Sequence, residues 1–139
     1  MKLTIDELID FIGKVEIVDI EERSDTAIQE FNDYGRWYDE SCQDWRDNAL
    51  FNKMFLLDMQ QYYDSVLHIR GHLFLNEVYD RLGFPRTTIG QLVGWVYKNE
   101  NSHVDFGLNK ENENKMFMSG EIATAFLTFN VDGIIINKI

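Results

Sequence analysis

Apolar and polar residues follow one another along the chain in patterns that predict its helices and strands. The first pattern is a capping box at Thr4–Glu7, in which a Thr hydroxyl and a Glu carboxylate satisfy the first free amides of a helix. Apolar residues then follow at helical spacing, and Gly13 stands where a left-handed C-cap belongs. These features predict a short N-terminal helix, followed by two strands over residues 15–20 and 26–34.

The longest predicted helix runs from Ser41 to about Leu67. Residues that favour helices dominate this segment, and neither Gly nor Pro interrupts it before Gly71. Its apolar face is irregular and is formed by Trp45, Ala49, Phe51, Met54, Phe55, Leu57, Met59, Tyr62, Val66 and Leu67. The pattern therefore predicts one long helix in the middle of the chain.

Turn residues divide the second half of the chain more clearly. After the apolar run His72–Leu75, Asn76 is the expected cap of a helix over Glu77–Leu82. Gly83 is its expected end, with Pro85 just beyond. This segment therefore predicts a short helix.

Strands are predicted for most of the remaining sequence. Gln91–Tyr97 and His103–Leu108 read as two strands joined by a polar turn, and Asn109–Lys115 reads as a surface loop. Ala123–Asn130 and Ile134–Ile139 flank an Asp-Gly pair that suits a tight hairpin turn. Helices and antiparallel strands without strict alternation predict an α+β fold: an N-terminal helix, an acidic region, one long helix, and a small antiparallel sheet with a short helix.

Charge is concentrated in one part of the 139-residue chain, whose net charge is −11. The stretch Asp19–Asp47 holds ten carboxylates and three arginines, a net charge of −7, and aromatic residues are interleaved with the acids. An acidic segment rich in aromatic residues differs from a disordered acidic tail, which lacks them. The stretch therefore predicts a foldable surface with a negative field, which repels nucleic acid and membranes and attracts basic partners.

The uneven charge also suggests a division of the chain. Residues 1–70 carry 16 acids and 7 bases, whereas residues 71–139 carry 8 acids and 6 bases. This shift places the expected boundary near Arg70–Gly71, between an acidic, aromatic N-terminal region and an α+β scaffold, unless the two form one continuous domain. The single cysteine, the absence of a long apolar run and the acids near the N-terminus favour a soluble cytoplasmic protein without a membrane span.

Four blocks in the second half resemble a known group of proteins: Leu73–Tyr79, Gly90–Trp95, Val104–Gly107 and Phe129–Gly133. With them, residues 71–139 resemble a C-terminal domain of uncharacterised proteins encoded by phages and integrative conjugative elements of Firmicutes. The resemblance does not extend to the acidic first half. It implies an origin in a mobile genetic element, and it implies no activity and no catalytic residues.

Two possible chemical sites are weighed against ordinary structural roles. Asp64, His68 and His72 are spaced by four residues and would align on a continuous helix as metal ligands, but Gly71 is expected to end that helix, and His103 is predicted in a distant strand. Cys42 has acids on both sides that disfavour its thiolate. We therefore expect no metal, no cofactor and no catalytic residue.

The acidic stretch is the predicted partner-binding surface, because Trp and Tyr are enriched among the residues that dominate binding energy at interfaces. The residues expected to contact a partner are Asp19, Glu21, Glu22, Asp25, Glu30, Asp33, Trp37, Tyr38, Asp39, Glu40, Asp44 and Asp47.

These observations favour an interaction protein over an enzyme. The hypothesis is a mobile-element inhibitor that occupies the cationic nucleic-acid site of a host defence protein, such as a Cas9-type CRISPR effector, and thus acts as an anti-CRISPR protein. Two alternatives stay open: a small hydrolase that uses Asp or Glu with a histidine, and a self-associating structural or maintenance protein of the element, for example a homodimer.

The charge balance leads to a direct prediction about nucleic acid. Because the net charge is −11 and the sequence has no basic cluster, the purified protein should not bind DNA or RNA at physiological salt. An electrophoretic mobility shift assay with labelled duplex at micromolar protein tests this. A salt-sensitive shift of the duplex would contradict the interpretation.

Overall fold

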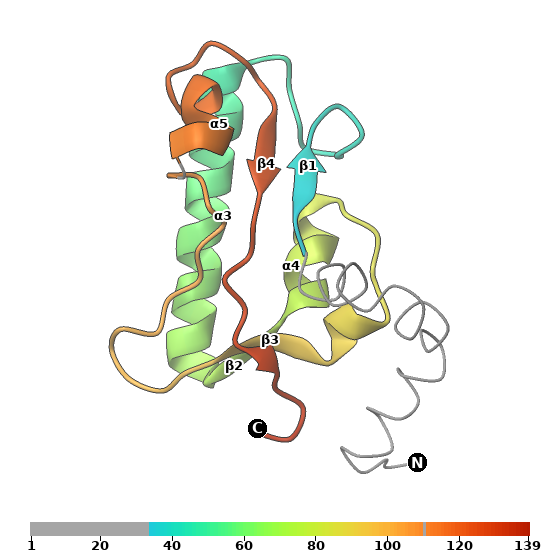
Figure 1. Ribbon diagram of the computed structural model, residues 1–139, viewed down its shortest axis with the longest axis vertical. Helices are drawn as coiled ribbons and strands as arrows, with labels where there is room; N and C mark the ends of the chain where they lie inside the picture. The colour runs from blue at the N-terminus through green and yellow to red at the C-terminus, as the bar shows by residue number, and fades with distance from the viewer. Residues whose placement is uncertain (1–33, 110) are drawn as a thin grey trace. The chain divides into compact units, whose positions relative to one another are not determined.

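The computed structural model describes residues 34–109 and 111–139, and Gly35–Ile139 form one compact unit (Figure 1). The predicted helix after Thr4 and the strand over residues 15–20 lie outside the described residues, as does nearly all of the strand over 26–34. The compact unit includes residues from both sides of the expected boundary at Arg70–Gly71. Its helices and small antiparallel sheets confirm the α+β class, including the long helix and the short one.

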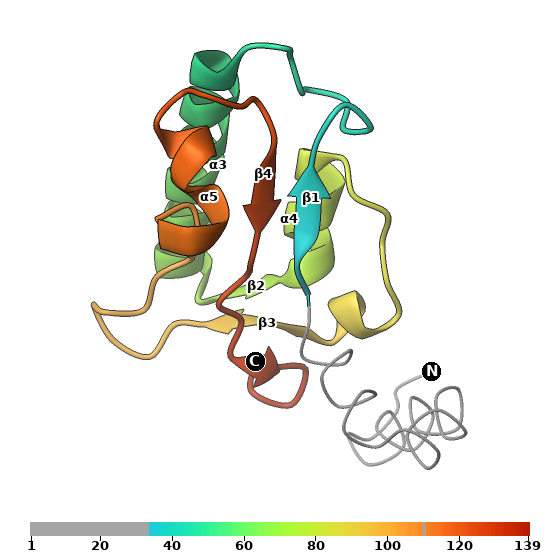
Figure 2. The same cartoon turned by 45° about the horizontal axis from the view of Figure 1, so that its top comes forward.

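The described strands are short and form two sheets. In the first, β1 (Arg36–Tyr38) pairs antiparallel with β4 (Ala125–Leu127). In the second, β3 (Val93–Val96) lies between β2 (His72–Phe74) and β5 (Gly133–Ile134), again antiparallel. Figures 1 and 2 show the first sheet beside the long helix α3 and in front of the short helix α4, with the second sheet near one end of both helices.

The long helix α3 (Ala49–Arg70) begins and ends at residues whose chemistry explains both positions. Asn48 is the N-cap, and its side-chain oxygen accepts a hydrogen bond of 3.0 Å from the Phe51 amide. At the other end Gly71 adopts a φ of 94°, a left-handed conformation that glycine tolerates best. The prediction of a helix here is confirmed, but its predicted start at Ser41 is wrong, because the preceding residues form turns.

The short helix α4 (Leu75–Leu82) ends at Gly83, as predicted, with a φ of 90°. Its predicted cap, Asn76, is instead a buried residue within the helix. Glu77 caps the start of the helix: its carboxylate accepts a hydrogen bond of 2.8 Å from the Phe74 amide. The helix therefore begins at Leu75, two residues earlier than a cap at Asn76 would place it.

The predicted strand His103–Leu108 is wrong, because side chains from elsewhere bind its backbone. The Val104 amide donates to Asp64 at 2.9 Å, and the Phe106 amide donates to Gln60 at 2.8 Å. Both acceptors belong to α3. The segment is therefore attached to a helix and forms no regular strand.

The predicted surface loop Asn109–Lys115 is also wrong, because it overlaps helix α5 (Glu111–Met118). Asn114 lies in this helix at a non-helical φ of −122° and is buried. Its side chain accepts a hydrogen bond from the Phe126 amide and donates to the carbonyl oxygens of Phe126 and Gly107. A polar residue in a polar run thus serves as a buried link to strand β4.

The predicted hairpin after Asn130 does not form, although Gly133 has the expected positive φ of 106°. Strands β4 and β5 belong to different sheets. Asp132 instead binds β3: its amide donates to the Gly94 carbonyl at 2.7 Å, and its carboxylate accepts from the Val96 amide at 2.8 Å. The Asp-Gly turn therefore joins the chain to β3 rather than to β4.

The core combines leucines with a cluster of aromatic rings. Tyr79, Phe84, Phe106 and Phe129 pack edge to face with centroid distances from 5.5 to 6.5 Å. Fully buried leucines fill the space around them: Leu56, Leu67, Leu73, Leu75, Leu82, Leu108 and Leu127. Among the described residues, no helix combines the length and the apolar character needed to cross a membrane.

The packing around Gly94 predicts a specific sensitivity. A Cβ at this position would overlap the carbonyl oxygen of Leu73 on the paired strand. Gly94→Ala should therefore lower the free energy of unfolding by more than about 3 kcal/mol in urea titrations. Gly120→Ala is the control, because a Cβ there meets no atom of the described residues within 4 Å and only its φ of 88° is unfavourable, at about 1–2 kcal/mol. Equal losses for both variants would contradict this packing.

Candidate functional site

Strand β1 places the two adjacent predicted contact residues, Trp37 and Tyr38, in opposite environments. Successive side chains of a strand point to opposite faces. Trp37 is 56% exposed, and its ring packs edge to face against Phe126 at 5.0 Å. Tyr38 is 0% exposed and stacks on Phe55. Trp37 is therefore available to a partner, whereas the side chain of Tyr38 is buried in the core.

The carboxylates after β1 that are predicted to contact a partner differ in their hydrogen-bond and ion-pair partners. Asp39 accepts hydrogen bonds from the amide and the hydroxyl of Ser41, which makes it part of a turn. Asp44 pairs with Arg81 at 2.7 Å. Glu40 and Asp47 are exposed and have no ion-pair partner among the described residues. We call residues 37–47 the Trp37 segment; of its predicted contacts, Trp37, Glu40 and Asp47 have the most freedom to meet a partner.

The structure does not describe half of the predicted contact residues. Asp19, Glu21, Glu22, Asp25, Glu30 and Asp33 lie outside the described residues.

Cys42 lies within the Trp37 segment and is buried. Burial raises the pKa of its thiol, and the charge of Asp39 acts in the same direction, while a hydrogen bond from the backbone opposes them. A raised pKa keeps the thiol protonated and poorly nucleophilic near neutral pH. Cys42 therefore contributes to packing rather than to chemistry.

A cluster of metal-ligating side chains, Asp64, His68 and His103, lies at the other end of α3. His103 Nδ1 lies 3.1 Å from both carboxylate oxygens of Asp64, and His68 Nε2 lies 4.0 Å from Asp64 Oδ2. One ligand atom from each of the three residues lies within 4.8 Å of the others. The sequence pattern suggested His72 as the third member, but the structure places His103 there, while the His72 ring contacts Phe74.

The loop between β3 and α5 explains why His103 was missed. It returns to α3 because the Val104 amide donates to Asp64, so that His103 lies over the helix. The prediction of a strand over His103–Leu108 had separated it from Asp64 and His68. The pairing depends on a contact between residues 39 apart in the sequence, which helical spacing does not reveal.

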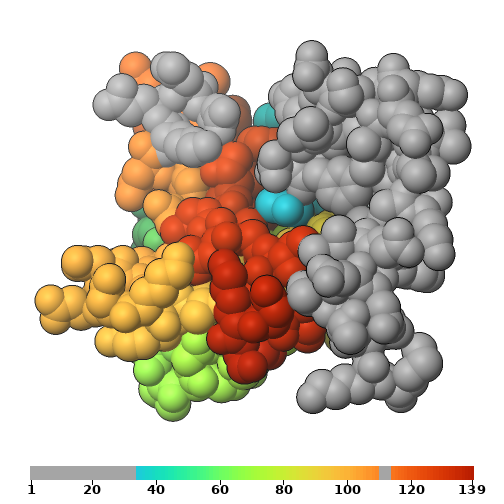
Figure 3. All heavy atoms as spheres, turned by 60° about the horizontal axis from the view of Figure 1, so that its bottom comes forward, coloured from blue at the N-terminus to red at the C-terminus, as the bar shows by residue number. Residues whose placement is uncertain are grey.

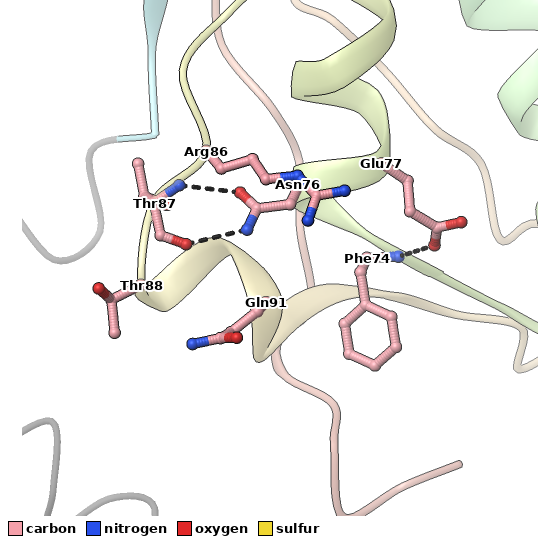
Figure 4. Close-up of a pocket in the computed structure, with 7 residues that line it drawn as sticks. All are labelled: Phe74, Asn76, Glu77, Arg86, Thr87, Thr88 and Gln91. Atoms are coloured by element: carbon pink, nitrogen blue, oxygen red, sulfur yellow. Dashed lines mark hydrogen bonds between the residues drawn. The ribbon is translucent and has the colours of Figure 1, made fainter.

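An open cleft of about 450 Å³ lies beside α4 and is lined by Phe74, Asn76, Glu77, Arg86, Thr87, Thr88 and Gln91 (Figure 4). Several of its polar groups already have hydrogen-bond or ion-pair partners. Asn76 exchanges two hydrogen bonds with the Thr87 backbone, and Arg86 pairs with Asp80. The cleft therefore presents few free groups that could orient a ligand.

Comparison with known proteins gives one match. A family model described as a family of unknown function (DUF6353) matches residues 8–139. The chain belongs to this family. No curated protein and no solved structure matches the chain.

The family match extends what the sequence blocks had indicated. The sequence blocks indicated an uncharacterised domain over residues 71–139, and the family match confirms an uncharacterised domain there. The match also covers most of the acidic first half. The first half therefore belongs to the same family as the second. The acidic stretch, the Trp37 segment and the Asp64–His68–His103 cluster all lie within it.

The buried Tyr38 predicts an unusual result of mutation. Its hydroxyl has no hydrogen-bond partner among the residues that the structure describes, whereas that of Tyr63 donates to the Glu77 carbonyl at 3.3 Å. Tyr38→Phe should therefore leave the free energy of unfolding at pH 7 unchanged or raise it by up to about 1 kcal/mol, and the control Tyr63→Phe should lower it by about 1 kcal/mol. Urea unfolding measures the free energy of unfolding of both variants. A larger loss of this free energy for Tyr38→Phe than for Tyr63→Phe would show that the Tyr38 hydroxyl has a hydrogen-bond partner.

The same tyrosine predicts a pH dependence. Burial raises the pKa of Tyr38 in the folded protein, while a tyrosine in the unfolded chain has a pKa of about 10. The stability contributed by this shift is present below about pH 10 and is lost as the pH rises further. The stability advantage of Tyr38→Phe over the wild type should therefore grow above about pH 10, and an advantage that is independent of pH would contradict the shift.

Proposed function

We propose that the protein is a non-enzymatic, acidic binding protein, encoded by a mobile genetic element, that occupies the cationic nucleic-acid site of a host defence protein. The observation that carries the proposal is the exposed Trp37 in a segment with exposed carboxylates. Three residues separate this segment from the acidic stretch 19–33 of the chain. A large ring and a high density of negative charge are thereby combined over a short stretch of sequence.

Trp37 has the properties of an anchor residue. Its ring is 56% exposed but is packed against Phe126 on the paired strand, which limits its rotation before binding. An ordered aromatic side chain loses little conformational entropy when it is buried by a partner. Trp is also among the residues that most often dominate binding energy at interfaces.

The distribution of charge favours a basic partner. Residues 1–34 hold ten acids and three bases, whereas residues 35–139 hold 14 acids and 10 bases. The excess of negative charge is therefore largest in the part of the chain that leads into the Trp37 segment. A groove that has evolved to hold phosphates, at about one charge per 1.7 Å of duplex, attracts closely spaced carboxylates by the same electrostatics.

A Cas9-type effector is a suitable example of the partner class. Such proteins hold a nucleic-acid duplex in a positively charged channel and read a short DNA motif through arginines. Carboxylates of the Trp37 segment could pair with these arginines while Trp37 stacks on the protein surface. Occupation of the channel would exclude the target DNA by competition, without any chemical step.

Charge reversal in the Trp37 segment tests the proposal. The protein is immobilised, exposed to lysate of a bacterial host and washed, and the retained protein is identified by mass spectrometry. We expect a basic nucleic-acid-binding protein that duplex DNA and high salt both displace. Glu40→Lys with Asp47→Lys should strongly reduce its retention, because both carboxylates are exposed and lack ion-pair partners among the described residues.

Two matched controls make this result specific. Asp58→Lys with Glu100→Lys changes the net charge equally at exposed positions outside the Trp37 segment and should preserve more binding. Trp37→Ala should cost about 2 kcal/mol of binding free energy or more, whereas Tyr62→Ala, at the same 56% exposure, should cost little. A partner that binds the Glu40/Asp47 variant as well as the wild type, or that DNA does not displace, would refute the proposal.

A further inference from the structure

We propose that Asp64, His68 and His103 form a binding site for a divalent transition-metal ion of the Zn²⁺ class. The proposal is independent of the proposed binding function, because it concerns other residues at the opposite end of α3. It rests on the position, the spacing and the chemistry of these three side chains.

The fold brings the three residues together from two segments. Asp64 and His68 are separated by four residues in α3 and therefore lie on the same side of the helix. His103 comes from the loop that follows β3, and Figure 3 shows this loop (yellow to orange) beside the end of α3 (light green) on an exposed face. The side chains are accessible, with 28% exposure for Asp64, 31% for His68 and 57% for His103.

The spacing of the ligand atoms fits a metal ion with small adjustments. Two ligands about 2.1 Å from a tetrahedral ion lie about 3.4 Å from each other. The His103–Asp64 distance of 3.1 Å is slightly shorter than this value, and the His68–Asp64 distance of 4.0 Å is slightly longer. A rotation of the exposed histidine rings would bring both distances to the required value.

Hydrogen bonds already hold the ligands near these positions. The Val104 amide donates to Asp64 Oδ1 at 2.9 Å, so Oδ2, which lies 3.1 Å from His103 Nδ1, is the oxygen that would bind an ion in place of the His103 proton. The His68 ring is bounded by Tyr97 at 5.0 Å and stacks on His103 at 5.4 Å. Neighbours that restrict the orientation of a ligating imidazole generally strengthen metal binding.

Metal binding requires a change of tautomer at both rings. His68 Nε2 lies 2.5 Å from the Ser102 carbonyl oxygen, which can only accept a hydrogen bond, so Nε2 carries the proton in the metal-free protein. Coordination through Nε2 moves this proton to Nδ1, and coordination through His103 Nδ1 likewise moves its proton to Nε2. The ion thereby replaces the protons that face Asp64 and Ser102.

The donor set selects the class of metal. Two imidazoles and one carboxylate suit Zn²⁺, Co²⁺, Ni²⁺ or Fe²⁺, whereas Mg²⁺ and Ca²⁺ prefer oxygen ligands alone. Three protein ligands also leave at least one coordination position open. Because the site is exposed, water or a donor group of a bound molecule would fill that position.

Titration with Zn²⁺ and Co²⁺ tests the site. The full chain is titrated in a calorimeter with excess Mg²⁺ present, which saturates weak carboxylate binding along the acidic stretch. We expect one equivalent of Zn²⁺, and Co²⁺ should give the visible absorption bands of a nitrogen-ligated ion. His68→Gln and His103→Gln should each weaken binding by at least about tenfold.

His72→Gln is the matched control, because His72 is the third histidine of the chain and its ring contacts Phe74 instead of the cluster. This variant should bind Zn²⁺ with an affinity within about twofold of the wild type. Circular dichroism checks that each variant is folded. Equal weakening by His72→Gln, or no stoichiometric binding by the wild type at 100 µM Co²⁺, would overturn the proposal.

A measurement on the wild-type protein tests the same metal site without any variant. In proton–nitrogen NMR spectra of the imidazole rings, Zn²⁺ should shift the signals of His68 and His103 and leave those of His72 in place. Unchanged ring signals of all three histidines, with shifts only of the backbone amide signals of the carboxylate-rich segments, would show that the ion binds elsewhere.

Discussion

Hydrogen bonds from side chains to backbone groups hold this fold together where regular strands do not. The described strands have only two to four residues each, so most of the connecting backbone has no partner in a sheet. Buried amides and carbonyls that lack a partner cost about 1–3 kcal/mol each. Side chains of Gln60 and Asp64 meet this need for the segment after His103, and Asn114 meets it for β4.

Asn130 shows how one side chain can connect several segments. Its side-chain oxygen accepts hydrogen bonds from the Trp95 ring and from the Asp105 amide, each at 2.8 Å, and its side-chain nitrogen donates to the His103 carbonyl at 2.9 Å. Strand β3 is thereby joined to the segment that carries His103. The position of His103 over α3 therefore depends on polar contacts from both sides of the loop.

The parts of the fold that could be predicted from sequence are those governed by local chemistry. Gly71 and Gly83 end helices because each adopts a left-handed conformation that suits glycine, and this signal is visible in the sequence. Asn76 and Asn114 could not be assigned in this way, because their partners lie in other segments and their polarity suggested a cap and a surface loop. The acidic stretch and Trp37 were identified by composition, but the burial of Tyr38 and the approach of His103 to Asp64 follow only from tertiary packing.

The pairing of β1 with β4 has a consequence for the order in which the protein assembles. Trp45 donates a hydrogen bond to the Ala123 carbonyl across 78 residues, close to where β1 and β4 meet. Contacts between such distant residues require closure of a long loop and form slowly. On the ribosome, β1 is synthesised long before β4, so the segment that carries Trp37 stays without its partner strand until β4 has also been synthesised.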